Sequence, residues 1–122
     1  MSELPKKLFV VVTKGLDSEL SSVALTIANG GITAGLSVDV FLTSNGVDLA
    51  RKRATDMTHV QPCEPLRQLI ADLQARGGCL YACTPCVKNR GYEQEDLIDG
   101  TIITGASVMH NAIKEGATTL SF

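Results

Sequence analysis

Three of the four cysteines of this 122-residue chain lie in one short segment. They are Cys79, Cys83 and Cys86, between the pair Gly77-Gly78 and the pair Arg90-Gly91. An ionised cysteine is a strong nucleophile and a soft metal ligand. The spacing therefore suggests a sulfur-handling or redox thiol pair, part of a zinc site, or an iron–sulfur cluster. Inert core cysteines are the fourth interpretation, because free cysteine is among the most often buried residue types.

The two metal interpretations fit the spacing poorly. The three cysteines have the C-x-x-x-C-x-x-C pattern of radical S-adenosylmethionine enzymes, but Cys79 and Cys83 are predicted at opposite ends of one strand, about 13 Å apart. That separation is too large for one iron–sulfur cluster. Zinc needs four ligands, and the chain offers no second close pair. The other available ligands are Cys63, His59 and His110.

A predicted strand-to-helix junction favours ionised thiols in this segment. The apolar run from Cys79 to Ala82 predicts a buried strand that ends at Cys83. Thr84 is predicted to cap the next helix and Pro85 suits its first position, so Cys86 falls in the first turn. Unpaired N–H groups and the positive end of the helix dipole stabilise a thiolate there.

Cys83 is the main candidate nucleophile, because it lies at the end of its strand, while Cys86 is a candidate resolving thiol. Lys88 and Arg90 add positive charge to the same segment. Cys63 has two interpretations. It is a structural residue of the core or a loop, or it is a resolving thiol or second sulfur carrier. His59 is either an ordinary surface residue or a base that deprotonates a nearby thiol.

Alternating strand and helix patterns predict an α/β sheet with helices on both faces. The apolar face of the first helix is expected to contain Leu20, Val23, Ala24, Ile27 and Ala28. The predicted strands are Leu8 to Thr13, Val38 to Thr43, Cys79 to Cys83, Thr101 to Ile103 and Ala117 to Phe122. Helices are predicted from Asp17 or Ser18 to Ala34, briefly after Val47, from Pro65 to Gly77, after Thr84, and from Ala106 to Glu115.

Ligands of parallel α/β sheets bind beyond the carboxyl ends of the strands. That edge is expected to carry Lys14-Gly15, Ser44-Asn45 and the segment from Cys83 to Cys86. We expect the loop that contains His59 and Cys63 to lie near the same edge. The strand ends therefore define the predicted site.

The composition predicts a single domain over residues 1–122. A net charge of −2 and an aromatic content of 4% give no general attraction to nucleic acid and few stacking platforms for its bases. No apolar stretch is long enough to span a membrane, so a cytoplasmic location is expected. There is no Walker loop or G-x-S-x-G motif, and no cofactor is predicted.

The chain resembles the DsrE/DsrF-like family of small sulfur-relay proteins. The resemblance covers nearly the whole length and rests on the order and spacing of four pieces. They are the strand Leu8 to Thr13, the segment Ala34 to Thr43, the strand end Tyr81-Ala82-Cys83 with Arg90-Gly91 behind it, and the closing segment Thr119 to Phe122.

This resemblance implies a three-layer α/β/α fold with a mostly parallel five-stranded sheet. It also implies assembly as a homo-oligomer, a trimer or hexamer, with protein sulfur donors and acceptors. Active members carry a cysteine at the position of Cys83 that accepts sulfane sulfur as a persulfide, the role of a sulfur carrier or sulfurtransferase. Cys86 completes a C-x-x-C pair that many relatives lack, so a thiol–disulfide redox protein is the alternative. A non-catalytic binding subunit is the third.

Overall fold

The computed structural model describes residues 6–122, which form five strands, four α-helices and two short 3₁₀ helices. All five strands are parallel and lie in the order β4-β3-β2-β1-β5. The elements are β1 (Lys7–Val12), α1 (Glu19–Thr33), β2 (Ser37–Leu42), η1 (Ser44–Ala50), α2 (Leu66–Ala75), β3 (Cys79–Cys83), α3 (Thr84–Asn89), η2 (Gln94–Asp96), β4 (Ile102–Thr104), α4 (Ser107–Lys114) and β5 (Thr118–Ser121).

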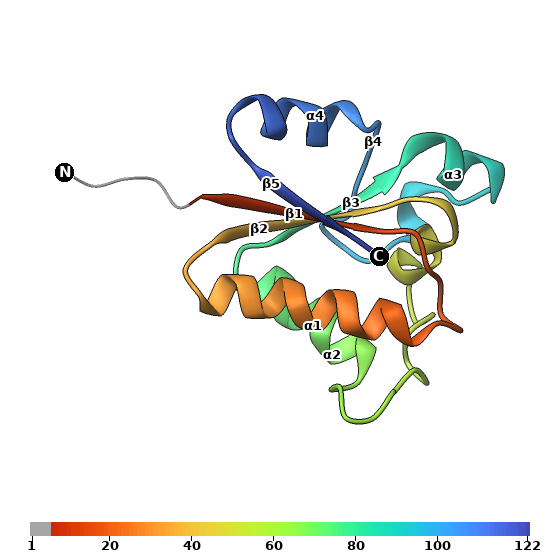
Figure 1. Cartoon of the computed structure of the whole chain (residues 1–122). Helices are drawn as coiled ribbons and strands as arrows, with labels where there is room; N and C mark the ends of the chain where they lie inside the picture. The colour runs from red at the N-terminus through yellow and green to blue at the C-terminus, as the bar shows by residue number, and fades with distance from the viewer. Residues whose placement is uncertain (1–5) are drawn as a thin grey trace.

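Helices cover both faces of the sheet, as Figure 1 shows. α1 and α2 pack side by side on one face. α4 lies on the opposite face, where it joins β4 and β5, the two edge strands. The predicted three-layer α/β/α class is therefore confirmed, and the mostly parallel sheet is entirely parallel.

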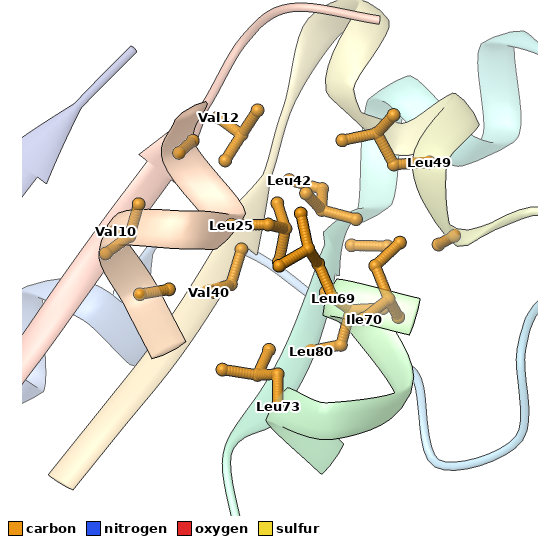
Figure 2. Close-up of a cluster of buried hydrophobic side chains, with 14 of the residues drawn as sticks. Val10, Val12, Leu25, Val40, Leu42, Leu49, Leu69, Ile70, Leu73 and Leu80 are labelled. Carbon is orange, nitrogen blue, oxygen red and sulfur yellow. The ribbon is translucent and has the colours of Figure 1, made fainter. Parts of the chain in front are cut away.

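The main core lies between the sheet and the α1–α2 layer (Figure 2). Alternate residues of each strand face this layer, and Val10, Val40 and Leu80 are in register across β1, β2 and β3. Leu25 of α1 and Leu73 of α2 are fully buried against them. These continuous apolar strands are typical of a parallel sheet covered on both faces.

The predicted apolar face of α1 is only partly correct. Leu20 and Ile27 are exposed, whereas Ser21 and Leu25 are fully buried. Ser21 is accommodated because its hydroxyl donates to the carbonyl of Gly15 at 2.6 Å. A buried serine of this kind interrupts the hydrophobic period that sequence analysis uses.

The opposite face of the sheet combines aromatic stacking with a partly buried ion pair. The rings of Phe9 and Tyr81 stack with their centroids 5.8 Å apart. Asp39, only 5% exposed, accepts a hydrogen bond from Lys7 Nζ at 2.7 Å and another from the Cys79 N–H at 3.1 Å. The carboxylate is thus compensated, as a buried charge requires.

No helix within residues 6–122 is both long and apolar enough to cross a membrane.

Tyr81 provides a test of this face by pH titration. Burial raises the pKa of Tyr81 to about 12, and the charges of Asp39 and Cys79 act in the same direction. Burial, followed by the hydrogen bond to Asp48, also raises the pKa of Tyr92. Folding raises the pKa of Tyr81 above its ordinary value of 10.0. The contribution of Tyr81 to the free energy of unfolding is therefore present below pH 10.0 and is lost as the pH rises toward about 12.

We therefore expect little tyrosinate absorbance from the folded protein at pH 10, where the unfolded chain is half ionised. The two tyrosines of the chain are separated by the Tyr92→Phe variant, which leaves Tyr81 as the only signal. A midpoint at the ordinary tyrosine pKa in that variant, with the fold intact by circular dichroism, would contradict the buried environment of Tyr81.

Candidate functional site

The candidate site lies at the carboxyl ends of β2 and β3. Cys83 is the last residue of β3 and occupies the N-cap position of α3, with an extended backbone. Thr84 is already the first helical residue, so its predicted capping role is wrong by one position. The strand runs directly into the helix, which places Cys86 one turn beyond Cys83 on the same side of the junction. Both thiols are free and half-buried.

The sulfur of Cys86 lies against the loop that follows β2. The backbone N–H of Ser44 donates to Cys86 Sγ at 3.2 Å, and Thr43 Oγ1 lies 3.6 Å from the same sulfur. Ser44 has a φ of 53°, an uncommon left-handed conformation for a residue other than glycine. This conformation accompanies the direct contact between the Ser44 amide and the sulfur. Non-glycine residues in this region carry local strain and are often found at functional sites.

Several groups act on the ionisation of Cys86. Burial alone would raise its pKa, but hydrogen bonds from Thr43, the Ser44 amide and Cys83 outweigh it, and the charge of Arg90 adds to them. The net result is a pKa of Cys86 below the ordinary cysteine value. A thiolate is the nucleophilic form of cysteine, so this environment favours reactivity.

A hydrogen-bond network fixes Arg90 beside the thiols. Its guanidinium donates to Asn45 Oδ1 at 2.8 Å and to the carbonyl of Cys86 at 3.4 Å, and it pairs with Asp48 Oδ1 at 3.4 Å. Tyr92 in turn donates its hydroxyl proton to Asp48 Oδ1 at 2.6 Å. Arg90 is therefore held by groups from both η1 and α3, which limits its movement relative to Cys86.

Gly46 lets the loop after β2 approach β1. A Cβ atom at this position would lie 2.2 Å from the carbonyl oxygen of Val12, so no larger residue fits without a backbone shift. The loop is further tied by the Thr43 N–H, which donates to the same carbonyl at 3.0 Å. The position of the Ser44 amide thus depends on close packing between η1 and the end of β1. The pair Asn45-Gly46, whose residue types are typical of a turn, lies inside η1.

The remaining predicted residues lie away from this pair of thiols. Cys79 is half-buried at the start of β3, with the length of the strand between it and Cys83. Cys63 lies on the α1–α2 side, where it lines a cavity with Asn29 and Leu69. His59 is exposed, and its Nε2 lies 3.0 Å from the Cys63 carbonyl.

The expectation that the loop containing His59 and Cys63 lies beside the strand ends is therefore not met. The Leu66 N–H donates to the Thr58 carbonyl, which closes this loop against the start of α2. No hydrogen bond within residues 6–122 joins His59 or Cys63 to the Cys83–Cys86 pair.

The described residues also give no support to a metal site. Within residues 6–122, no group of three or more His, Cys, Asp or Glu side chains is arranged to hold a metal ion. Cys79, one of the residues available as a zinc ligand, lies beside Asp39 and Tyr81 on the aromatic face of the sheet.

Sequence reasoning identified Ser44, Asn45 and Arg90 as residues near the thiols. It did not identify Thr43, Asp48 or Tyr92. Ser44 and Asn45 follow from the rule that strand ends converge at one edge of a parallel sheet. Asp48 and Tyr92 reach the site through the packing of η1 on the segment after α3, which no local motif indicates. Together the fold and these contacts define a small parallel α/β protein with a candidate site of two thiols at its strand ends.

The chain belongs to the DsrE/DsrF-like family, since the sequence model of that family matches residues 6–122. This family is generally linked to sulfur relay. The chain is 29% identical to uncharacterized protein MJ0989 of Methanocaldococcus jannaschii, over 95% of this chain and 99% of that protein. It is 31% identical to uncharacterized protein MK0008 of Methanopyrus kandleri, over 85% of this chain and 83% of that protein.

Solved structures show the same fold. The YchN protein of E. coli superposes with a TM-score of 0.77 at 21% identity, covering 97% of this chain and 99% of YchN. MTH1491 of Methanobacterium thermoautotrophicum, described as a protein of unknown function, superposes with a TM-score of 0.73 at 17% identity. That match covers 97% of this chain and 99% of MTH1491.

Proposed function

We propose that this protein is a sulfur carrier, a sulfurtransferase component that accepts sulfane sulfur as a persulfide on Cys83 and passes it to a protein acceptor. The observation that carries this proposal is the position of Cys83, half-buried at the end of β3 and one helical turn before a second thiol. Membership of a family linked to sulfur relay supports the same chemistry.

The chemistry requires a thiolate that attacks the outer sulfur of a donor persulfide. The donor leaves as a thiol, and Cys83 keeps the sulfur as Cys83–S–SH. An acceptor thiolate then attacks the outer sulfur and expels the Cys83 thiolate. A strand-end position suits both steps, because partial exposure lets a macromolecular donor or acceptor reach the sulfur.

A thiol–disulfide redox protein is the second candidate function. The observation that favours it is the position of Cys83 at the N-cap of α3, with Cys86 one helical turn further along the chain. Equilibration in redox buffers followed by thiol labelling tests it: a pair that stays unlinked under clearly oxidising conditions excludes this function and leaves the carrier role standing.

Protein partners, a cytoplasmic location and a homo-oligomer, a trimer or hexamer, complete the proposal. Large apolar side chains are available for assembly on α4 and on the two edge strands, and they are partly exposed in the single chain. These side chains are Ile102, Ile113 and Leu120. Sedimentation analysis of the purified protein measures the assembly directly, and a monomer at all concentrations would exclude it.

Peptide mass spectrometry after sulfur loading tests the carrier assignment. The reduced protein is incubated with glutathione persulfide, trapped by alkylation and digested with chymotrypsin, which cleaves after Tyr81 and so separates Cys79 from Cys83. We expect the added sulfur atom on the peptide that contains Cys83, and little on the peptides with Cys63 or Cys79. Loading that favours Cys63 or Cys79, or no loading at all, would overturn the proposed role of Cys83.

A further inference from the structure

Cys86 has a built environment that the carrier role of Cys83 does not require. Its sulfur contacts the Ser44 amide at 3.2 Å and Thr43 Oγ1 at 3.6 Å. Arg90 lies on the same side, with its guanidinium bonded to the Cys86 carbonyl at 3.4 Å. We call Thr43, Ser44 and Arg90 the thiolate seat. A backbone N–H, a hydroxyl and a fixed cation around one sulfur are groups that stabilise negative charge.

Two structural features hold the residues of the thiolate seat in place. Ser44 keeps a left-handed backbone, with φ of 53°, and the adjacent Gly46 is packed against Val12 too closely for any side chain. Arg90 is bonded to Asn45 and paired with Asp48 as well as bonded to the Cys86 carbonyl.

The titratable and charged groups around the Cys86 sulfur come from three elements. Cys83 lies at the end of β3, Asp48 lies in η1, and Arg90 follows α3. Asp48 is partly neutralised by Arg90 and by the Tyr92 hydroxyl, so the seat itself presents donors and a cation to the sulfur. Lys88 is exposed on α3 and is not among the groups that act on Cys86.

We propose that the thiolate seat makes Cys86 the resolving nucleophile, which discharges a Cys83 persulfide as hydrosulfide whenever no acceptor has taken the sulfur. This inference rests on the proposed carrier function of Cys83. It assigns a positioning role to Arg90 and to the loop of Thr43 and Ser44, and it predicts the product formed by the isolated chain.

The step balances without an additional proton. The Cys86 thiolate attacks the inner sulfur of Cys83–S–SH, a Cys83–Cys86 disulfide forms, and the outer sulfur leaves as HS⁻. The sulfane sulfur is reduced and the two thiols are oxidised. Hydrosulfide is a weaker base than a cysteine thiolate and therefore the better leaving group, which favours attack on the inner sulfur. An external dithiol must then reduce the disulfide before the next cycle.

The test follows sulfur on the full-length protein after brief loading with glutathione persulfide and removal of the excess donor. We expect the wild type to gain one sulfur atom and then to lose it, ending with the mass of the reduced chain less two hydrogens. One equivalent of hydrosulfide, trapped with monobromobimane, should appear at the same rate. Cys86→Ser should keep the sulfur and release no hydrosulfide.

Variants of Arg90 separate positioning from a merely structural role. Arg90→Gln should slow discharge several-fold near neutral pH but not at alkaline pH, where the thiol ionises without assistance. Arg90→Lys should recover part of the rate, because it restores the charge. Lys88→Gln is the matched control, since it removes a cation from the same segment away from the sulfur, and it should discharge as the wild type does.

Each outcome is informative. A wild type that takes up no sulfur overturns the proposed carrier function itself. A wild type that holds its persulfide without releasing hydrosulfide leaves that function intact and overturns the resolving role of Cys86. Discharge by Cys86→Ser at the wild-type rate also overturns it. If the rate of hydrosulfide release has the same pH profile in Arg90→Gln and the wild type, with both folded by circular dichroism, the positioning role of Arg90 is contradicted.

Discussion

Replacing Cys83 with serine is expected to abolish persulfide formation while leaving the fold intact. Serine is nearly isosteric with cysteine, and Cys83 is half-buried and makes no capping hydrogen bond to α3, so folding should be little affected. A hydroxyl is not ionised at neutral pH and cannot carry sulfane sulfur. Intact-mass analysis after treatment with glutathione persulfide should therefore show no gain of a sulfur atom at this position.

The Cys79→Ser variant is the matched control for this experiment. Cys79 belongs to the same strand as Cys83 and is likewise half-buried, but it lies at the opposite end. It should gain sulfur as the wild type does. Wild-type loading of Cys83→Ser would show that another thiol is the acceptor, and Cys86 would then be the first residue to examine. The combined Cys83→Ser, Cys86→Ser variant decides that question.

Replacing Gly46 with alanine is expected to be the most damaging small change in the site. The new methyl group would lie 2.2 Å from the Val12 carbonyl oxygen, and the backbone of η1 or β1 would have to move. Because overpacking typically costs 1–3 kcal/mol, we expect a loss of about 3 kcal/mol in the free energy of unfolding. Chemical denaturation measures this change.

Gly30→Ala is a control that is expected to change the free energy of unfolding in the opposite direction. Gly30 lies in α1, and a Cβ atom there would meet nothing within 4 Å. Alanine in place of a helical glycine should stabilise the protein by about 0.5–1 kcal/mol. Equal stabilities for Gly46→Ala and the wild type would show that the loop after β2 is not packed as described. Gly46→Ala should also lose the contact that its neighbour Ser44 makes to Cys86.

The sequence predicted the sheet well because parallel strands carry a local signal. The five predicted strands coincide with β1 to β5 within two residues at each end, since continuous apolar and β-branched runs are typical of strands covered on both faces. Their common edge then placed Ser44 and Asn45 beside Cys83. The family resemblance supplied the five-stranded three-layer architecture, which the family match and the fold confirm.

Long-range packing accounts for what the sequence did not reveal. The loop with His59 and Cys63 was expected at the strand ends, but its contacts are with the α1–α2 layer, and nothing in its polar composition indicates which layer it meets. The role of Asp48 depends on its meeting both Arg90 and Tyr92, each more than forty residues away along the chain. Pairings of this kind arise only when the strands are assembled.

The two thiols and the residues that hold them all lie between residues 43 and 92, in β2, η1, β3, α3 and the segment just after it. α4 and β5 contribute nothing to that cluster, yet they carry exposed apolar side chains at the far edge of the sheet. The reactive thiols and the exposed apolar side chains thus lie in separate parts of the chain. Substitutions of exposed residues in α4 and β5 are therefore expected to leave the contacts around Cys86 unchanged.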